Sequence, residues 1–147
     1  MIDTARVADA IETYVHDSFL RVRVEREHGH AGDRSWVGIR LIPASADRVS
    51  IEMFVDSDGG VSYLFADSPM SDEIEESTSS AVDSLLQVVR DLAEAGAVFV
   101  RSHRWMRALS PSYWGAPGDP KIADILESGR GAVVARWAGW ETREPGA

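Results

Sequence analysis

The sequence predicts an α+β fold, in which an antiparallel β-meander of four to six strands carries a short N-terminal helix and one long helix packed on the sheet. Three observations lead to this prediction. Apolar and polar residues alternate in four consecutive segments between residues 19 and 66, as in half-buried strands. Short polar connections separate these segments, and such connections join antiparallel neighbours. Apolar residues recur at helical spacing on both sides of this region.

The first expected element is a helix at about residues 3–16. Asp3 is a residue type that caps helix N-termini, because its carboxylate accepts hydrogen bonds from the first free backbone N–H groups. Ile2 and Val7 occupy the two positions of a hydrophobic staple. The apolar face of the helix consists of Val7, Ala10, Ile11, Tyr14 and Val15.

Four strands should follow, and short turns should connect them. The last connection, Asp-Ser-Asp-Gly-Gly at 56–60, is a hairpin signal, because glycine and aspartate tolerate the backbone angles of tight turns. The residues 28–34 are expected to form the loop between the first two strands. The predicted strands are Phe19–Glu27, Ser35–Pro43, Arg48–Val55 and Gly60–Ala66.

The second face of this meander is not uniformly polar. It carries four large apolar side chains, Trp36, Ile42, Phe54 and Leu64. A fully hydrated sheet face does not need such residues. We therefore expect the C-terminal segment or a partner chain to cover part of it.

The long helix is expected to begin near Ser68–Ser71, to run for roughly 23 residues and to end at Gly96. Its first turns would hold Asp72, Glu73, Glu75 and Glu76, where the helix dipole favours negative charge. The buried stripe would consist of Ile74, Ala81, Val82, Leu85, Leu86, Val89, Leu92 and Ala93.

The C-terminal third predicts shorter elements. A strand is expected at Ala97–Arg101 and another at Ala132–Trp137, with an irregular stretch at Ser102–Asp119 after the first. Asp119-Pro120 should cap a third helix, with Ile122, Ile125 and Leu126 facing inward and Gly129 ending it. The tail at residues 141–147 is expected to fray.

Length and composition indicate one ordinary domain spanning residues 1–147. The chain has no cysteine, which excludes disulfides and thiol chemistry. It has no apolar run of membrane-spanning length and no N-terminal signal pattern. We therefore expect a cytoplasmic protein with no membrane partner.

The net charge of −9 arises from one part of the chain. Between Asp56 and Glu94 there are ten acidic residues and a single base, Arg90, whereas the flanking regions are nearly neutral. A surface of one charge attracts partners of the opposite charge and opposes the approach of nucleic acid. The sequence therefore predicts a basic partner and no nucleic acid.

Catalytic and metal-binding motifs are weak. His28 and His30 with Asp33 could ligate a metal only if further ligands came from elsewhere, and a polar turn explains them as well. The acids at 56–60 begin like a calcium loop but lack its later ligands. No nucleophile or phosphate-binding motif is present. We expect no catalytic residue, no metal and no cofactor.

An arginine- and aromatic-rich segment, residues 101–114, is the second distinctive feature. It could cover the second sheet face with its arginines paired to the acidic helix, form a protein interface, or bind nucleic acid; we favour the first of these and give the last the least weight. The expected partner-binding residues combine the acidic block with this segment: Asp56, Asp58, Asp72, Glu73, Glu75, Glu76, Arg104, Trp105, Arg107, Tyr113 and Trp114.

In size, acidity and lack of a catalytic motif the chain is similar to bacterial immunity and antitoxin proteins and to small inhibitors that mimic nucleic acid. This similarity of kind implies a non-catalytic acidic protein that neutralises or regulates a partner, such as a toxin or nuclease. The alternative is a small-ligand-binding domain or enzyme with a pocket lined by Trp36, Trp105, Tyr113 and Trp114. A homodimer through the apolar sheet face is compatible with either.

Overall fold

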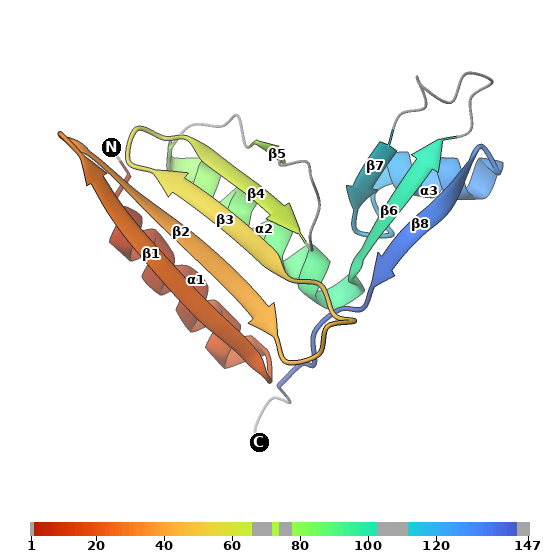
Figure 1. The fold of residues 1–147 in the computed structure, drawn as a ribbon, viewed down its shortest axis with the longest axis horizontal. Coiled ribbons are helices and arrows are strands. Elements are labelled where there is room, and N and C mark those ends of the chain that lie inside the picture. The colour runs from red at the N-terminus through yellow and green to blue at the C-terminus, as the bar shows by residue number, and fades with distance from the viewer. Residues whose placement is uncertain (1, 66–71, 74–77, 103–111, 144–147) are drawn as a thin grey trace.

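A computed structural model of the chain describes residues 2–65, 72–73, 78–102 and 112–143. In this part of the chain three helices accompany two antiparallel sheets, so the α+β prediction is confirmed. Figure 1 shows the two sheets diverging from the region where the second helix passes into the sixth strand.

The first sheet is the predicted meander. Its strands are hydrogen-bonded in chain order and every pair is antiparallel. The first hairpin is longer than expected, because residues 28–31 continue the strand and only Gly32 and Asp33 form its turn. His28 and His30 therefore lie on a strand and not in a loop. The strands are β1 (Val22–Ala31), β2 (Arg34–Pro43), β3 (Ile51–Asp56), β4 (Val61–Phe65) and β5 (Asp72–Glu73).

Helix α1 (Thr4–Ser18) begins as the sequence predicted. The Asp3 carboxylate accepts a hydrogen bond from the N–H of Arg6, and Ile2 and Val7 are both buried. Helices α1 and α2 (Thr78–Ala95) lie behind the first sheet in Figure 1. They cover one sheet face, and this core includes Val7, Ile11, Val15, Val37, Ile39, Leu41, Ile51, Met53, Leu85 and Val89.

The start of the second helix was predicted wrongly. Asp72 and Glu73 belong to β5, where they pair with Tyr63 and Ser62, and not to a helical first turn. The edge of β4 presents backbone N–H and C=O groups, and pairing with them favours a strand at Asp72–Glu73. The helix prediction considered only the local effect of the helix dipole. Helix α2 has 18 residues and α1 has 15, so no single long helix dominates the fold.

The later strands form a second sheet and do not extend the meander. Its order is β7 (Ser112–Gly115), β6 (Ala97–Ser102) and β8 (Gly131–Trp137). The stretch expected to be irregular thus contains a strand, because Ser112–Gly115 pairs with the edge of β6.

Helix α3 (Pro120–Ser128) packs on this second sheet. Asp119 caps it and Gly129 ends it in a left-handed conformation, both as predicted. Ile122 is buried with Val98 and Val100, while Leu126 is 36% exposed and does not face inward as expected.

The chain from Ala138 to Arg143, which includes the first three residues of the predicted frayed tail, is hydrogen-bonded to the rest of the domain. We call residues 138–143 the C-terminal strap. Its backbone bonds to Asp47, Ala93 and Ser18, through the N–H groups of Ala138, Trp140 and Arg143 respectively. Residues 144–147 lie outside the described part. Among the described residues, no helix is long and apolar enough to cross a membrane.

Candidate functional site

The hairpin tip between β3 and β4 is held by charges within the chain. Asp56 accepts a hydrogen bond from the N–H of Asp58 at 2.9 Å, as aspartates in tight turns do. The Arg34 guanidinium lies 2.7 Å from Asp56 and 2.8 Å from Asp58. The Asp58 N–H, followed by Arg34, lowers the pKa of Asp56. Both predicted partner-binding acids of this tip therefore already have an internal cation.

The face of the first sheet that points away from α1 and α2 carries a stacked aromatic pair. Trp36 and Phe54 lie 5.5 Å apart between ring centroids, with 25° between their planes. The indole spreads over Gly29, where an added Cβ would stand 2.1 Å from a ring carbon. Gly38 lies beside Phe54 in the register, and a Cβ there would meet nothing closer than a backbone oxygen at 3.9 Å.

This face remains accessible. Phe54 is 41% exposed, so the described C-terminal residues do not provide the cover that the sequence predicted. Ile42 and Leu64 are half-buried on the same face. We call the surface formed by Trp36, Gly38, Ile42, Phe54 and Leu64 the open sheet face.

Charged residues surround the apolar part of the open sheet face. Glu25 pairs with Arg23 at 3.1 Å and with Arg40 at 3.9 Å. Glu27 and Glu52 stand on the same face by register, both exposed, and neither forms an ion pair with a described residue. The surface therefore has an apolar centre and a polar rim, in which the acids Glu25, Glu27 and Glu52 accompany the bases Arg23 and Arg40.

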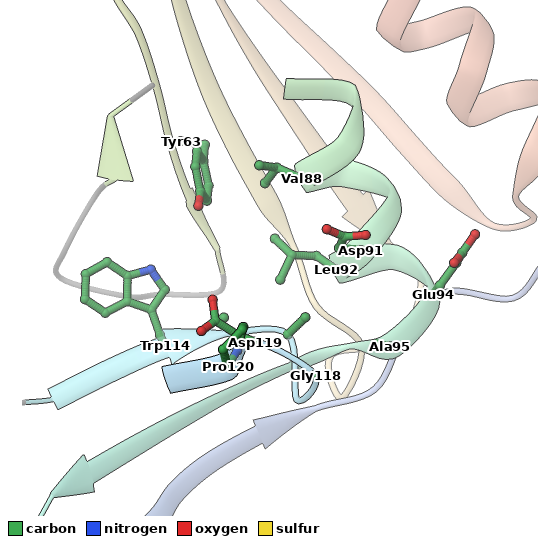
Figure 2. Close-up of a pocket in the computed structure, with 12 residues that line it drawn as sticks. Tyr63, Val88, Asp91, Leu92, Glu94, Ala95, Trp114, Gly118, Asp119 and Pro120 are labelled. Atoms are coloured by element: carbon green, nitrogen blue, oxygen red, sulfur yellow. The ribbon is translucent and has the colours of Figure 1, made fainter. Parts of the chain in front are cut away.

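A cleft lies on the other side of the first sheet, between α2, β4 and the loop that leads from β7 into α3. Its volume is about 510 Å³. Tyr63 and Trp114 contribute aromatic walls, Leu92 an apolar wall, and Asp91 and Asp119 carboxylates (Figure 2). The other described residues that line it are Val88, Glu94, Ala95, Gly115, Ala116, Gly118 and Pro120.

The predicted ligand pocket does not form as expected. Of its three described aromatic residues only Trp114 lines the cleft, because Trp36 lies on the opposite sheet face and Tyr113 packs against the small core of the second sheet. Trp105 lies outside the described residues. The sequence does not single out Tyr63 as a site residue, because an inward position in an alternating strand is equally typical of a core residue. Asp91 and Asp119 are not singled out either, because an acid on a helix and a helix cap are ordinary features.

The structure brings few of the predicted partner-binding residues together. Asp56 and Asp58 share the hairpin tip, Asp72 and Glu73 form the edge strand β5, and Tyr113 and Trp114 lie in β7. The remaining ones lie outside the described residues: Glu75, Glu76, Arg104, Trp105 and Arg107.

The weak metal signals find no support in the described part of the chain, where no group of three or more histidine or acidic side chains converges. Both histidines of β1 are exposed. Asp56 is engaged by Arg34 and by the Asp58 N–H, which uses both of its carboxylate oxygens.

Comparison of the chain with models of protein families, with curated proteins and with solved structures finds no match.

Proposed function

We propose that this chain is a non-catalytic binding protein that neutralises or regulates a partner protein, and that the partner docks on the open sheet face. The observation that carries the proposal is the stacked pair of Trp36 and Phe54 on the sheet face opposite α1 and α2, where Phe54 is 41% exposed in the described structure. Burying this pair against another protein would remove apolar surface from water.

The aromatic pair suits an interface because it is already ordered. The indole is held between Phe54 and the backbone at Gly29, so binding would cost little further side-chain entropy. Tryptophan is enriched among the residues that dominate binding energy, and a polar rim around an apolar centre is the usual arrangement of an interface.

Charge supports a basic partner. Glu27 and Glu52 lie on the open sheet face without ion-pair partners among the described residues. Since the chain carries a net charge of −9, two copies repel each other, whereas a basic protein is attracted. A toxin or nuclease with a basic active site has the required chemistry.

Gly38→Arg tests the proposal. An added Cβ at Gly38 meets nothing closer than the backbone oxygen of Glu27 at 3.9 Å, so we expect the variant to fold with its arginine projecting over the open sheet face. Ala10→Arg is the matched control, because it adds the same charge and bulk at an exposed position of α1, which lies behind the sheet. Proteins captured by wild type from the native host would be identified by mass spectrometry, purified and titrated against both variants.

We expect the partner to bind wild type and Ala10→Arg with equal affinity. It should bind Gly38→Arg at least tenfold more weakly, because the arginine obstructs the centre of the interface. Equal affinity for Gly38→Arg would contradict the proposal. A captured protein that proves to be a second copy of this chain, detected by light scattering, would replace the basic partner with a homodimer.

The cleft favours the second candidate function, a domain that binds a small ligand. Its volume of about 510 Å³ lies within the range of ligand sites, and aromatic and carboxylate groups converge on it. Thermal-shift screening against metabolites tests this candidate, since a ligand that binds only the folded state raises the melting temperature.

A further inference from the structure

The cleft between α2, β4 and α3 has walls that would suit an elongated organic group. Leu92 is buried and Val88 half-buried, so one side is apolar. Tyr63 and Trp114 are half-buried and approach from two different sheets. Figure 2 shows the hydroxyl end of Tyr63 directed toward the side of the cleft where Trp114 and Asp119 lie.

Two carboxylates of the cleft each have one oxygen engaged in their own helix. The Asp91 Oδ1 accepts a hydrogen bond from the Gln87 amide at 2.8 Å, and the Asp119 Oδ1 accepts one from the Lys121 N–H at 2.9 Å. The Asp119 Oδ2 lies near Gly115, a residue that lines the cleft.

The described walls of the cleft are acidic. Three lining residues are acidic, and no lysine, arginine or histidine is among the described residues that line it. Arg90, the nearest base along α2, places its guanidinium over the ring of Tyr14 at 5.8 Å, and its charge also interacts with those of Glu94 and Asp91. Apolar walls with charge of one sign concentrate the electric potential in the space between them.

We propose that this cleft binds an organic cation, a guanidinium or ammonium group on a short aliphatic stem. The two aspartates would accept hydrogen bonds from the cationic head, and such bonds are stronger than neutral ones. Tyr63 and Trp114 would attract the cation through their rings. Leu92 and Val88 would contact the stem. The inference is independent of the docking proposal, because the cleft and the open sheet face lie on opposite sides of the first sheet.

Propylguanidinium and propylurea are a matched pair of probes, since they have nearly the same shape and only the first is charged. Binding to the full chain would be followed by NMR, using the backbone amides of Gly115, Ala116 and Gly118 and the indole N–H of Trp114, assigned with Trp114→Phe. We expect a saturable shift with propylguanidinium at concentrations on the order of 10 mM or below, and none with propylurea.

Asp91→Asn and Asp119→Asn test the two carboxylates. Asparagine is nearly as good a helix cap as aspartate, so Asp119→Asn removes the charge and keeps the cap. Asp83→Asn and Asp124→Asn are matched controls, because both are exposed on the same helices and neither lines the cleft. We expect each cleft variant to bind propylguanidinium about two- to fivefold more weakly and each control to bind like wild type.

Three results would overturn the inference: no saturable shift, equal shifts with propylurea, or equal weakening in the cleft variants and the controls.

A blocked Ala-Arg-Ala tripeptide decides the source of the cation. Binding at least as tight as that of propylguanidinium assigns the site to a protein side chain, and exclusion of the tripeptide assigns it to a free amine or guanidine. Cation binding by Gly38→Arg should equal that of wild type, which separates this test from the docking test.

Discussion

The indole N–H of Trp140 donates a hydrogen bond to the backbone carbonyl of Val49 at 2.6 Å, across 91 residues of sequence. The same ring meets Phe19 edge-on at 5.1 Å. Phe19 follows α1 and Val49 precedes β3, so one side chain of the C-terminal strap joins both to the core. The strap is therefore part of the domain and not an appendage.

Replacing Trp140 with Phe should destabilise the chain by about 1–3 kcal/mol, because it leaves the carbonyl of the buried Val49 without a donor. The free energy of unfolding in urea measures this. Trp36→Phe is the control, since the Trp36 indole lies on the open sheet face and makes no hydrogen bond in the described structure; we expect a loss of about 0.5 kcal/mol or less. Equal losses in the two variants would show that the Trp140 hydrogen bond is not important.

Truncation tests the whole strap. A chain that ends at Arg143 keeps every described contact and should match the full chain in stability. A chain that ends at Trp137 loses Trp140 and its contacts, and should be destabilised by at least about 3 kcal/mol, as when a large buried aromatic side chain is removed. Urea unfolding of both proteins measures the difference. If they are equally stable, the strap does not hold the core.

Local chemistry was predictable from the sequence. The cap at Asp3, the staple at Ile2, the cap at Asp119 and the stop at Gly129 each depend on residues within about one helical turn, and all are present in the structure. The meander was predictable for the same reason, because alternation and short turns are local patterns.

Pairing over long distances was not predictable. Asp72–Glu73 and Ser112–Gly115 become strands only because free edges of β4 and β6 are available. The turn at Asp56 was expected, but its cation Arg34 comes from another hairpin, 22 residues away. The cleft likewise combines Tyr63 with residues of two helices, and no spacing in the sequence indicates that they meet.

Gly96 ends α2 and should not tolerate a side chain. Its φ is +76°, and an added Cβ would lie 2.2 Å from the carbonyl oxygen of Trp137. Gly96→Ala should cost more than about 2 kcal/mol, from the left-handed backbone and from the displaced neighbouring chain. Gly118→Ala is the control, because a Cβ there meets nothing within 4 Å. Urea unfolding should show little change for the control; a mild effect at Gly96 would mean that the junction with β8 adapts freely.

The charge of Asp56 should make stability depend on pH. Its pKa is lowered from 3.8, first by the Asp58 N–H and then by Arg34. A carboxyl whose pKa is lower in the folded state binds fewer protons there than in the unfolded chain. The stabilisation is therefore complete well above pH 3.8 and is lost as the pH falls below 3.8 through the folded-state pKa.

We expect the stability difference between wild type and Asp56→Asn, measured in urea, to shrink as the solution is acidified through this range. Arg34→Gln removes only the second cause of the shift, so its pH dependence should be weaker than that of wild type but still present. A difference between wild type and Asp56→Asn that stays constant from neutral pH to pH values below 3.8 would contradict this account.

The acidic block should act on a basic partner mainly through the rate of association. Replacing Glu73, Glu75 and Glu76 together with lysine should slow association about tenfold at low salt. The effect should shrink as salt screens the charges. Lysine at Asp17, Asp124 and Glu127 gives a control with the same net charge, because these exposed acids lie outside the block. Stopped-flow or surface-plasmon measurements of both triple variants separate position from net charge. Equal slowing in the two would leave only the total charge of the chain as the cause, and unchanged association in both would contradict electrostatic attraction of the partner.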